Sequence, residues 1–179
     1  MRLFYALWPE PDTQRHWLQA SAAALTSLGG QPLPAASLHL TLQFLGETRA
    51  DRVPALIRLG DDVAGAALSL RFDRIECWGR GDLACLRAES PAELLRLVGH
   101  LGHGLQTLGL APDPRRFKAH VTLARRLQHA APSLPLWPPL DWQATTLALV
   151  SSRLAAEGPS YHAVARWSLQ DAPTGAGSG

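Results

Sequence analysis

The sequence predicts an α+β protein with largely antiparallel sheets, and three observations lead to that class. The expected elements run strand, helix, strand, helix, hairpin, helix and three strands, so strands do not alternate regularly with crossover helices. A length of 179 residues with 46% hydrophobic content suits one globular unit with its own core. The tetrapeptide His-Leu-Thr-Leu at residues 39–42 returns 81 positions later as His-Val-Thr-Leu at 120–123, which predicts two similar lobes facing each other across a cleft.

Apolar spacing and turn residues define the elements of the first half. Helical spacing after Pro-Glu-Pro-Asp predicts a helix that the pair Gly29 and Gly30 stops. Pro54 is compatible with a second helix only because it falls in the first turn. We therefore expect a strand at residues 1–8, a helix from 9–12 to 28, a Pro-rich connector at 31–36, the first motif strand at 38–45 ended by Gly46, and a helix at about 51–63.

The second half opens with two strand-like runs joined by Gly-Arg-Gly-Asp, which has the turn chemistry of a hairpin. An apolar stripe of Leu and Val then predicts a helix that Gly109 ends. We expect paired strands at 68–78 and 83–88, a helix at 91–108, the second motif strand at 117–127, a rigid, irregular connector at 132–139, and closing strands at 142–153 and 160–169.

The ends of the chain bear on domain organisation and location. We expect one two-lobed domain over residues 1–172 and a flexible tail at 173–179, where small residues predominate. The apolar run at the N-terminus is too short for a signal peptide, and no window approaches the roughly 20 apolar residues that cross a bilayer. These features predict a cytoplasmic protein without membrane contact.

Charge and cysteine usage exclude little and suggest few partners. The net charge is +2, and all the basic residues except Lys118 are Arg, so bulk charge gives no argument for nucleic-acid binding. Cys77 and Cys85 lack metal-type spacing and a secretory context, which predicts free thiols. A phosphate-binding loop of the form G-x-x-x-x-G-K-[ST] is absent from the sequence, which disfavours an ATP-dependent ligase or kinase.

The repeated tetrapeptide carries the chemistry. In a β-strand, His39 and Thr41 share one face while the two Leu side chains enter a core, and His120 and Thr122 repeat that pattern. Two imidazoles on opposite walls can act together as base and acid, because their ordinary pKa near 6.5 allows both protonation states. In-line displacement at phosphorus needs such a pair, and the threonine hydroxyls can bond the non-bridging phosphate oxygens.

Cations surround the second motif. Lys118 lies two residues before His120 and shares its strand face if pairing is regular, so it is a possible phosphate ligand. One of the two arginines that follow can clamp a phosphate bidentately. Strict alternation favours Arg126, whereas Arg125 needs a twist or a bulge to turn inward.

Residues 37–47 and 117–125 resemble the signatures of the two-histidine (2H) phosphoesterase superfamily, and within it those of the RNA 2′,3′-cyclic phosphodiesterases, also called 2′-5′ RNA ligases. The opening residues 2–7 and the closing residues 161–169 also fit, so the resemblance covers nearly the whole ordered chain. It implies a bilobal fold in which two mainly antiparallel sheets form a central cleft, with helices outside. Ala119 departs from the Pro that relatives often carry before the second histidine.

By this resemblance the protein opens a terminal 2′,3′-cyclic phosphate on RNA or a nucleotide to give a 2′-phosphate, with reversible 2′-5′ ligation as a further activity. His39 is implied as the proton donor to the leaving 3′-oxygen and His120 as the base that activates water. The resemblance also implies Arg125 as the phosphate-binding arginine, with Arg126 as second choice. We expect no metal, no cofactor and no obligate protein partner.

Other readings of these residues remain open. The rival function is a non-catalytic module that binds RNA or nucleotide phosphate on the same fold. His100 and His103 lie at metal-type spacing, but no Asp, Glu or Cys joins them, so a solvated helix face is favoured. Most of the six tryptophans, and Phe44, are expected to pack inside the protein rather than to stack on RNA bases.

Overall fold

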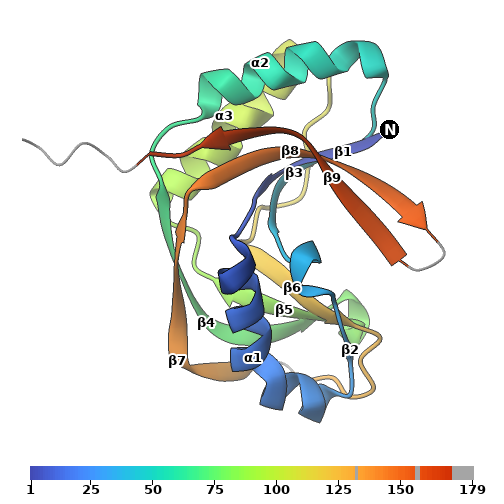
Figure 1. Ribbon diagram of the computed structural model, residues 1–179, viewed down its shortest axis with the longest axis vertical. Coiled ribbons are helices and arrows are strands. Elements are labelled where there is room, and N and C mark those ends of the chain that lie inside the picture. Colours follow the sequence, from blue (N-terminus) through green and yellow to red (C-terminus); the bar gives the residue numbers. More distant parts are fainter. Residues whose placement is uncertain (132, 156–157, 171–179) are drawn as a thin grey trace, which may run out of the picture.

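Two antiparallel sheets dominate the computed structural model, which describes residues 1–131, 133–155 and 158–170 (Figure 1). Their facing sides form the walls of a cleft, and helices cover the outer sides, as the predicted fold class requires. The first sheet has the strand order β3 (Leu40–Glu47), β1 (Arg2–Leu7), β8 (Thr146–Ala155) and β9 (Gly158–Ser168). The second has the order β2 (Gln31–Pro32), β6 (His120–Arg125), β5 (Leu83–Ala88), β4 (Leu68–Trp78) and β7 (Leu134–Ala144).

The helices form where the sequence predicts them. α1 (Pro11–Leu28) ends at Gly29, whose φ of 64° is the left-handed conformation that glycine adopts without strain. α2 (Val53–Val63) follows a single 3₁₀ turn and carries Pro54 at its start. α3 (Ala92–Thr107) buries its Leu and Val stripe. α2 and α3 pack together over the first sheet, and α1 packs against β2 and β7 of the second.

The two lobes are not the two halves of the sequence. The first sheet combines strands from both ends of the chain, because β1 pairs with β3 on one side and with β8 on the other. α1 comes from the first half but packs on the second sheet, and α3 comes from the second half but contacts β3. The prediction of two lobes is confirmed, but the spacing of 81 residues between the motifs does not divide the chain into one lobe per half. Strand pairing between distant segments decides this, and local spacing does not report it.

The Pro-rich connector expected at residues 132–139 is mostly strand. β7 begins at Leu134 and lies at the edge of the second sheet, where prolines are tolerated because no outer neighbour needs their missing N–H groups. The register against β4 shifts between the pairs Phe72–Leu140 and Arg74–Pro135, so the residues between 135 and 140 lie opposite a shortened stretch. This irregularity accommodates the prolines.

The strand expected at 142–153 is two strands in different sheets. β7 ends at Ala144 in the second sheet, and β8 begins at Thr146 in the first. The apolar pattern continues on both sides of Thr145, because both strands bury apolar residues. The sequence pattern therefore does not show that the chain passes from one sheet to the other at this residue. The first motif strand is shifted by two residues to Leu40–Glu47 and continues through Gly46, and the second is shortened to His120–Arg125. The connector at 31–36 contains the short strand β2. The hairpin strands β4 and β5 have the predicted bounds.

The core is divided between a large cluster that joins both sheets to the helices and a small one on the cleft side of the first sheet. Strand alternation explains the division. Leu3, Tyr5 and Leu7 of β1 belong to the large cluster, whereas Phe4 and Ala6 point the other way and form the small one with residues of β8. β1 is therefore buried on both faces, and one of those faces supports the cleft.

Three further expectations concern the rest of the chain. Cys77 and Cys85 are free thiols, as predicted. None of the helices within the described ranges is long and apolar enough to cross a membrane. The proposed end of the domain at residue 172 and the tail at 173–179 lie outside the described residues.

Candidate active site

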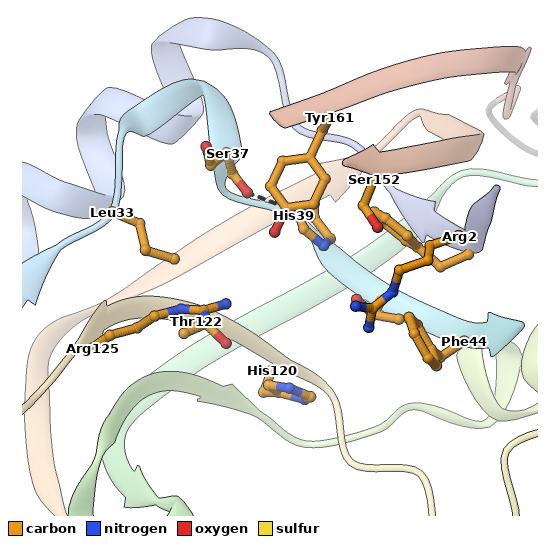
Figure 2. Close-up of a pocket in the computed structure, with 12 residues that line it drawn as sticks. Arg2, Leu33, Ser37, His39, Phe44, His120, Thr122, Arg125, Ser152 and Tyr161 are labelled. Atoms are coloured by element: carbon orange, nitrogen blue, oxygen red, sulfur yellow. Dashed lines mark hydrogen bonds between the residues drawn. The ribbon is translucent and has the colours of Figure 1, made fainter. Parts of the chain in front are cut away.

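A cavity of about 280 Å³ lies between the two sheets and brings both motifs together (Figure 2). His39 and Thr41 line one wall, and His120, Thr122 and Arg125 line the other. The apolar partners of the motifs, by contrast, are buried in the core. The alternation predicted for both tetrapeptides is therefore confirmed. Strands β1, β3, β8 and β9, together with the segment between β2 and β3, complete the lining with Arg2, Phe4, Leu33, Ser37, Phe44, Ser152 and Tyr161.

His39 lies between a 3₁₀ turn (Ala35–Ser37) and β3, and its ring is held from behind by the backbone. Nδ1 lies 2.7 Å from the carbonyl oxygen of Ser37. A carbonyl only accepts, so Nδ1 carries the proton, and Nε2 is left for the cavity. The rings of Phe4 and Trp8 stack on the imidazole at centroid distances of 4.9 and 5.1 Å, and Tyr161 meets it edge-on at 5.0 Å.

His120 is anchored in the same way at the start of β6. Its Nδ1 lies 2.8 Å from the carbonyl oxygen of Lys118, so Nδ1 again donates and Nε2 remains available. The Trp78 ring lies 4.4 Å from the imidazole centroid. Each histidine thus binds the carbonyl two residues before it, and this shared anchor fixes the same tautomer on both walls.

Burial disfavours the charged form of both histidines. It lowers the pKa of His39 to about 4, the positive charges of His120 and Arg125 lower it further, and the hydrogen bond to Ser37 opposes them. Burial also lowers the pKa of His120, with contributions of the same sign from Arg87 and Arg115. A bound anion would reverse these effects, because a negative charge nearby favours the imidazolium form.

A charged network supports the second wall beneath His120. Arg87, which faces His120 from β5, is almost fully buried and donates to the backbone oxygen of Ala119. Its Nε lies 3.2 Å from Glu76, which also accepts from Trp78 at 2.9 Å and from Arg74 at 2.9 Å. Burial raises the pKa of Glu76, but these hydrogen bonds and charges outweigh it and hold the pKa below its ordinary value. The network fixes both Trp78 and the segment that presents His120.

A β-bulge decides which arginine enters the cavity. Along β5 and β6, Ala84 pairs with Ala124 but the next residue, Cys85, pairs with Thr122, so Leu123 has no partner. The extra residue reverses the alternation, and Arg125 lines the cavity. Arg126 adopts a φ of 55° and its Nη1 donates to Gln31 Oε1 at 3.4 Å, away from the lining residues. Strict strand alternation by itself favours Arg126, which does not line the cavity.

The same bulge occurs in the first motif. Tyr5 pairs with Gln43 and Ala6 with Thr41, which leaves Leu42 without a partner in β1. Phe44 consequently points toward the cavity, where 37% of its surface is exposed and the Arg2 guanidinium lies 5.5 Å from its ring centroid. Phe44 is therefore not a core residue, contrary to the sequence expectation. Phe44 and Arg125 each follow their motif histidine by five positions and are structural counterparts.

The sequence reasoning missed several lining residues. Arg2, Tyr161 and Ser152 reach the cavity from strands at the two ends of the chain. Arg2, Phe4 and Trp8 fall on the same face of the first strand by alternation, and this pattern is the one sequence feature that groups them. No motif links them to His39. Trp8 stacks on His39 and the tilted ring of Trp78 contacts His120, so the expectation of packing holds for the buried Trp17 and Trp142 but does not describe these two.

Lys118 does not line this cavity. It precedes β6, and its Nζ lies 5.7 Å from the Trp78 ring centroid, in a neighbouring cavity. Within the part of the chain that the structure describes, no group of three His, Cys, Asp or Glu side chains is arranged to hold a metal ion. His100 and His103 are exposed on α3, as predicted.

Two titratable imidazoles with free Nε2 atoms, two hydroxyls and a guanidinium around one cavity are able to perform acid–base chemistry on a phosphate group. The comparisons with known proteins concern the class of the whole chain. The family described as LigT-like phosphoesterase matches residues 7–82. The RNA 2′,3′-cyclic phosphodiesterase of Thermus thermophilus is 33% identical over 95% of this chain and 91% of its own length, and that of Escherichia coli is 29% identical over 94% and 96%.

Solved structures show the same architecture. The apo structure of Escherichia coli LigT superposes with a TM-score of 0.83, at 27% identity over 95% of this chain and 98% of LigT. A Thermus thermophilus structure gives a TM-score of 0.82 at 30% identity, covering 96% of this chain and 99% of its own. The chain belongs to the LigT-like phosphoesterase family, and it is an enzyme of that family with the 2H phosphoesterase fold.

Proposed function

We propose that the protein hydrolyses the 2′,3′-cyclic phosphate at the end of an RNA or on a nucleotide and yields a 2′-phosphate. The matched anchoring of His39 and His120, which directs two Nε2 atoms at one cavity, carries this proposal. The name RNA 2′,3′-cyclic phosphodiesterase, borne by the Thermus thermophilus and Escherichia coli relatives, supports the substrate class. A structure of Escherichia coli LigT with 3′-AMP supports binding of a nucleotide in this fold.

The reaction is an in-line displacement at phosphorus. His120 Nε2 accepts a proton from water as the water oxygen bonds to phosphorus, and the bond between phosphorus and the ribose 3′-oxygen breaks. Protonated His39 donates its Nε2 proton to that oxygen, which leaves as a hydroxyl. The phosphate stays on the 2′-oxygen. Each proton transfer contributes roughly 10²–10⁴-fold to the rate.

Substrate binding favours the protonated donor that this scheme needs. Both histidines have a lowered pKa, so the donor must take up a proton from solvent when the substrate binds. The cyclic phosphate carries a negative charge, and its approach raises the pKa of the adjacent imidazoles. The Thr41 and Thr122 hydroxyls and the Arg125 guanidinium bind the non-bridging oxygens, where charge resides during transfer.

Ligation follows from the same groups with a different nucleophile. If the 5′-hydroxyl of a second RNA replaces water, the two proton transfers are unchanged and the product is a 2′-5′ phosphodiester with a free 3′-hydroxyl. No phosphoanhydride is consumed. Water is far more concentrated than any RNA hydroxyl. By mass action, we therefore propose hydrolysis as the main reaction and ligation as a minor variant that needs abundant RNA ends.

The test is turnover of 2′,3′-cyclic AMP and of a short RNA ending in a 2′,3′-cyclic phosphate, with EDTA present. We expect the wild type to release the 2′-phosphate alone. His39→Ala and His120→Ala should each lose about 10²–10⁴-fold in kcat, whereas His16→Ala, an exposed histidine on α1, should retain full activity. Thermal melting of each variant separates loss of chemistry from loss of fold.

A different outcome would favour the binding module. Absence of turnover by the wild type, together with RNA binding that survives loss of both histidines, would sink the catalytic proposal. Release of a 3′-phosphate would contradict the assignment of the 3′-oxygen as leaving group while leaving the histidine pair in place.

A further inference from the structure

A second, larger cavity of about 700 Å³ adjoins the first. Thr41, Phe44 and His120 line both cavities, so the two are neighbours that share one boundary. Most of the remaining lining comes from α3 and from the segment that leads into β6, with further residues from β3, β4 and β5. Apart from the shared Thr41 and His120, the phosphoesterase chemistry above uses no residue of this second cavity.

One wall of the second cavity is strongly basic. Arg115, Arg116 and Lys118 line it, and Asp113 is the only carboxylate among its lining residues. Asp113 is engaged by Arg115, whose Nε donates to its carboxylate at 2.9 Å. Within the described residues, Arg116 and Lys118 form no ion pair, and both are exposed. Two uncompensated cations therefore face this space.

The basic segment is fixed to the first motif strand. Gln43 is buried, its Nε2 donates to the Val98 carbonyl of α3 at 3.2 Å, and its Oε1 accepts from the Asp113 backbone N–H at 3.1 Å. Gln43 thus ties the segment before β6 to both β3 and α3. The cations stand on a supported segment at a defined place beside the histidines.

The first cavity is too small for a chain of nucleotides. Its volume of about 280 Å³ is near the lower limit of ligand pockets, roughly 300–1,000 Å³. An RNA whose terminal phosphate lies between the histidines must leave this space, and the shared boundary at His120 leads into the basic cavity. Cations beside aromatic rings, here Lys118 and Trp78, are the combination that binds single-stranded nucleic acid.

We propose that the second cavity binds the nucleotides that precede the terminal cyclic phosphate, with Arg116 and Lys118 contacting the RNA backbone. We call it the upstream subsite. The proposal rests on the proposed function and narrows it, because it assigns single-stranded oligonucleotides rather than cyclic mononucleotides as the preferred substrate class. Lys118 then binds an upstream phosphate and not the reacting one.

The experiment compares kcat/KM for 2′,3′-cyclic AMP with kcat/KM for a tetranucleotide ending in the same cyclic nucleotide. We expect the wild type to prefer the tetranucleotide, and the double variant Arg116→Gln, Lys118→Gln to lower that preference about tenfold or more. The slope of log kcat/KM against log salt for the tetranucleotide should fall by about 0.7 for each phosphate contact removed. Arg58→Gln, an exposed arginine on α2 outside both cavities, is the matched control and should keep preference and slope.

The outcomes separate this proposal from the proposed function. Equal use of both substrates by the wild type, or an unchanged preference in the double variant, would overturn the upstream subsite while the phosphodiesterase activity stands. If neither substrate is turned over, the proposed function fails. Fluorescence anisotropy with the tetranucleotide 2′-phosphate then still tests the subsite, which requires tighter binding by the wild type than by the double variant.

Discussion

The two motif strands share their geometry but differ in the residue that each bulge turns into the cavity. Both histidines bind the carbonyl two residues before them, and both strands carry an unpaired Leu directly after the threonine. In the first motif the bulge presents Phe44, and in the second it presents Arg125. The same backbone geometry thus places an aromatic ring, Phe44, on one wall and a cation, Arg125, on the other.

The surroundings of the two imidazoles differ accordingly. Aromatic rings enclose His39, whereas His120 lies beside Trp78 and above the buried Arg87. An apolar enclosure disfavours the charged form by desolvation, and a neighbouring cation disfavours it by repulsion. Burial is the largest cause of the lowered pKa on both walls, and repulsion by Arg87 adds to it at His120. Substitutions on each wall should therefore have different consequences.

The largest effect is expected from removal of both histidines at once. His39→Ala and His120→Ala act on one displacement, so the double variant should lose little more activity than the worse of the single variants. Single-turnover rates of the three variants provide the measurement. Losses that multiply fully would show that the two walls act independently, against the concerted transfer proposed here.

Loss of Arg125 is expected to lower activity more than loss of its sequence neighbour Arg126. Arg125→Ala removes a guanidinium from the cavity, and loss of a charged hydrogen bond worth about 1.5–3 kcal/mol lowers kcat/KM by about 10- to 100-fold. Arg126→Ala removes only an exposed contact with Gln31 and should change activity less than about twofold. Steady-state kinetics of both variants decides the assignment, and equal losses would contradict the role of the bulge.

The network under the second wall should contribute to stability as well as to catalysis. Arg87→Met deletes the contacts with Glu76 and with the Ala119 carbonyl. The Ala119 carbonyl keeps the Ala88 N–H as a donor at 3.2 Å, so the cost is that of one charged hydrogen bond, about 1.5–3 kcal/mol of unfolding free energy. Urea denaturation measures the loss. Arg71→Met, which breaks an exposed pair with Asp141, is the control and should cost less than about 1 kcal/mol.

The smallest expected effect is a shift of the pH profile. The reaction needs one protonated and one neutral histidine. In the free enzyme, kcat/KM should therefore fall below about pH 4, where His39 also becomes protonated, and above the pKa of His120, which lies below its ordinary value of 6.5 and where both are neutral. The optimum therefore lies on the acid side of 6.5. The optimum of kcat should lie higher, because bound phosphate raises both pKa values.

Substitution of one tryptophan on each wall distinguishes the limbs. Trp8→Leu admits water to His39, weakens its desolvation and moves the acid limb toward higher pH. Trp78→Leu does the same for His120 and moves the alkaline limb to higher pH. If both substitutions move the same limb, the assignment of limbs to histidines is wrong.

Much of the fold was predictable because it depends on local chemistry. The helices, their glycine stops and the hairpin of β4 and β5 follow from spacing and turn residues that act within a few positions. The crossover at Thr145 was not predictable, since alternation continues through it while the pairing partner changes. The Pro-rich edge strand β7 was missed for a similar reason, because only its place at the sheet edge makes its prolines acceptable.

The sequence by itself determined the pair of histidines, the threonines beside them and the apolar residues that anchor each motif. Polar and apolar residues alternate within each tetrapeptide, and successive side chains of a strand point to opposite faces. Only the tertiary structure decided which arginine enters the cavity, why Phe44 leaves the core, and which aromatic rings enclose His39. Those choices depend on the register between strands from distant parts of the chain. A single unpaired residue such as Leu123 reverses the facing of every residue after it, and no local pattern records where it falls.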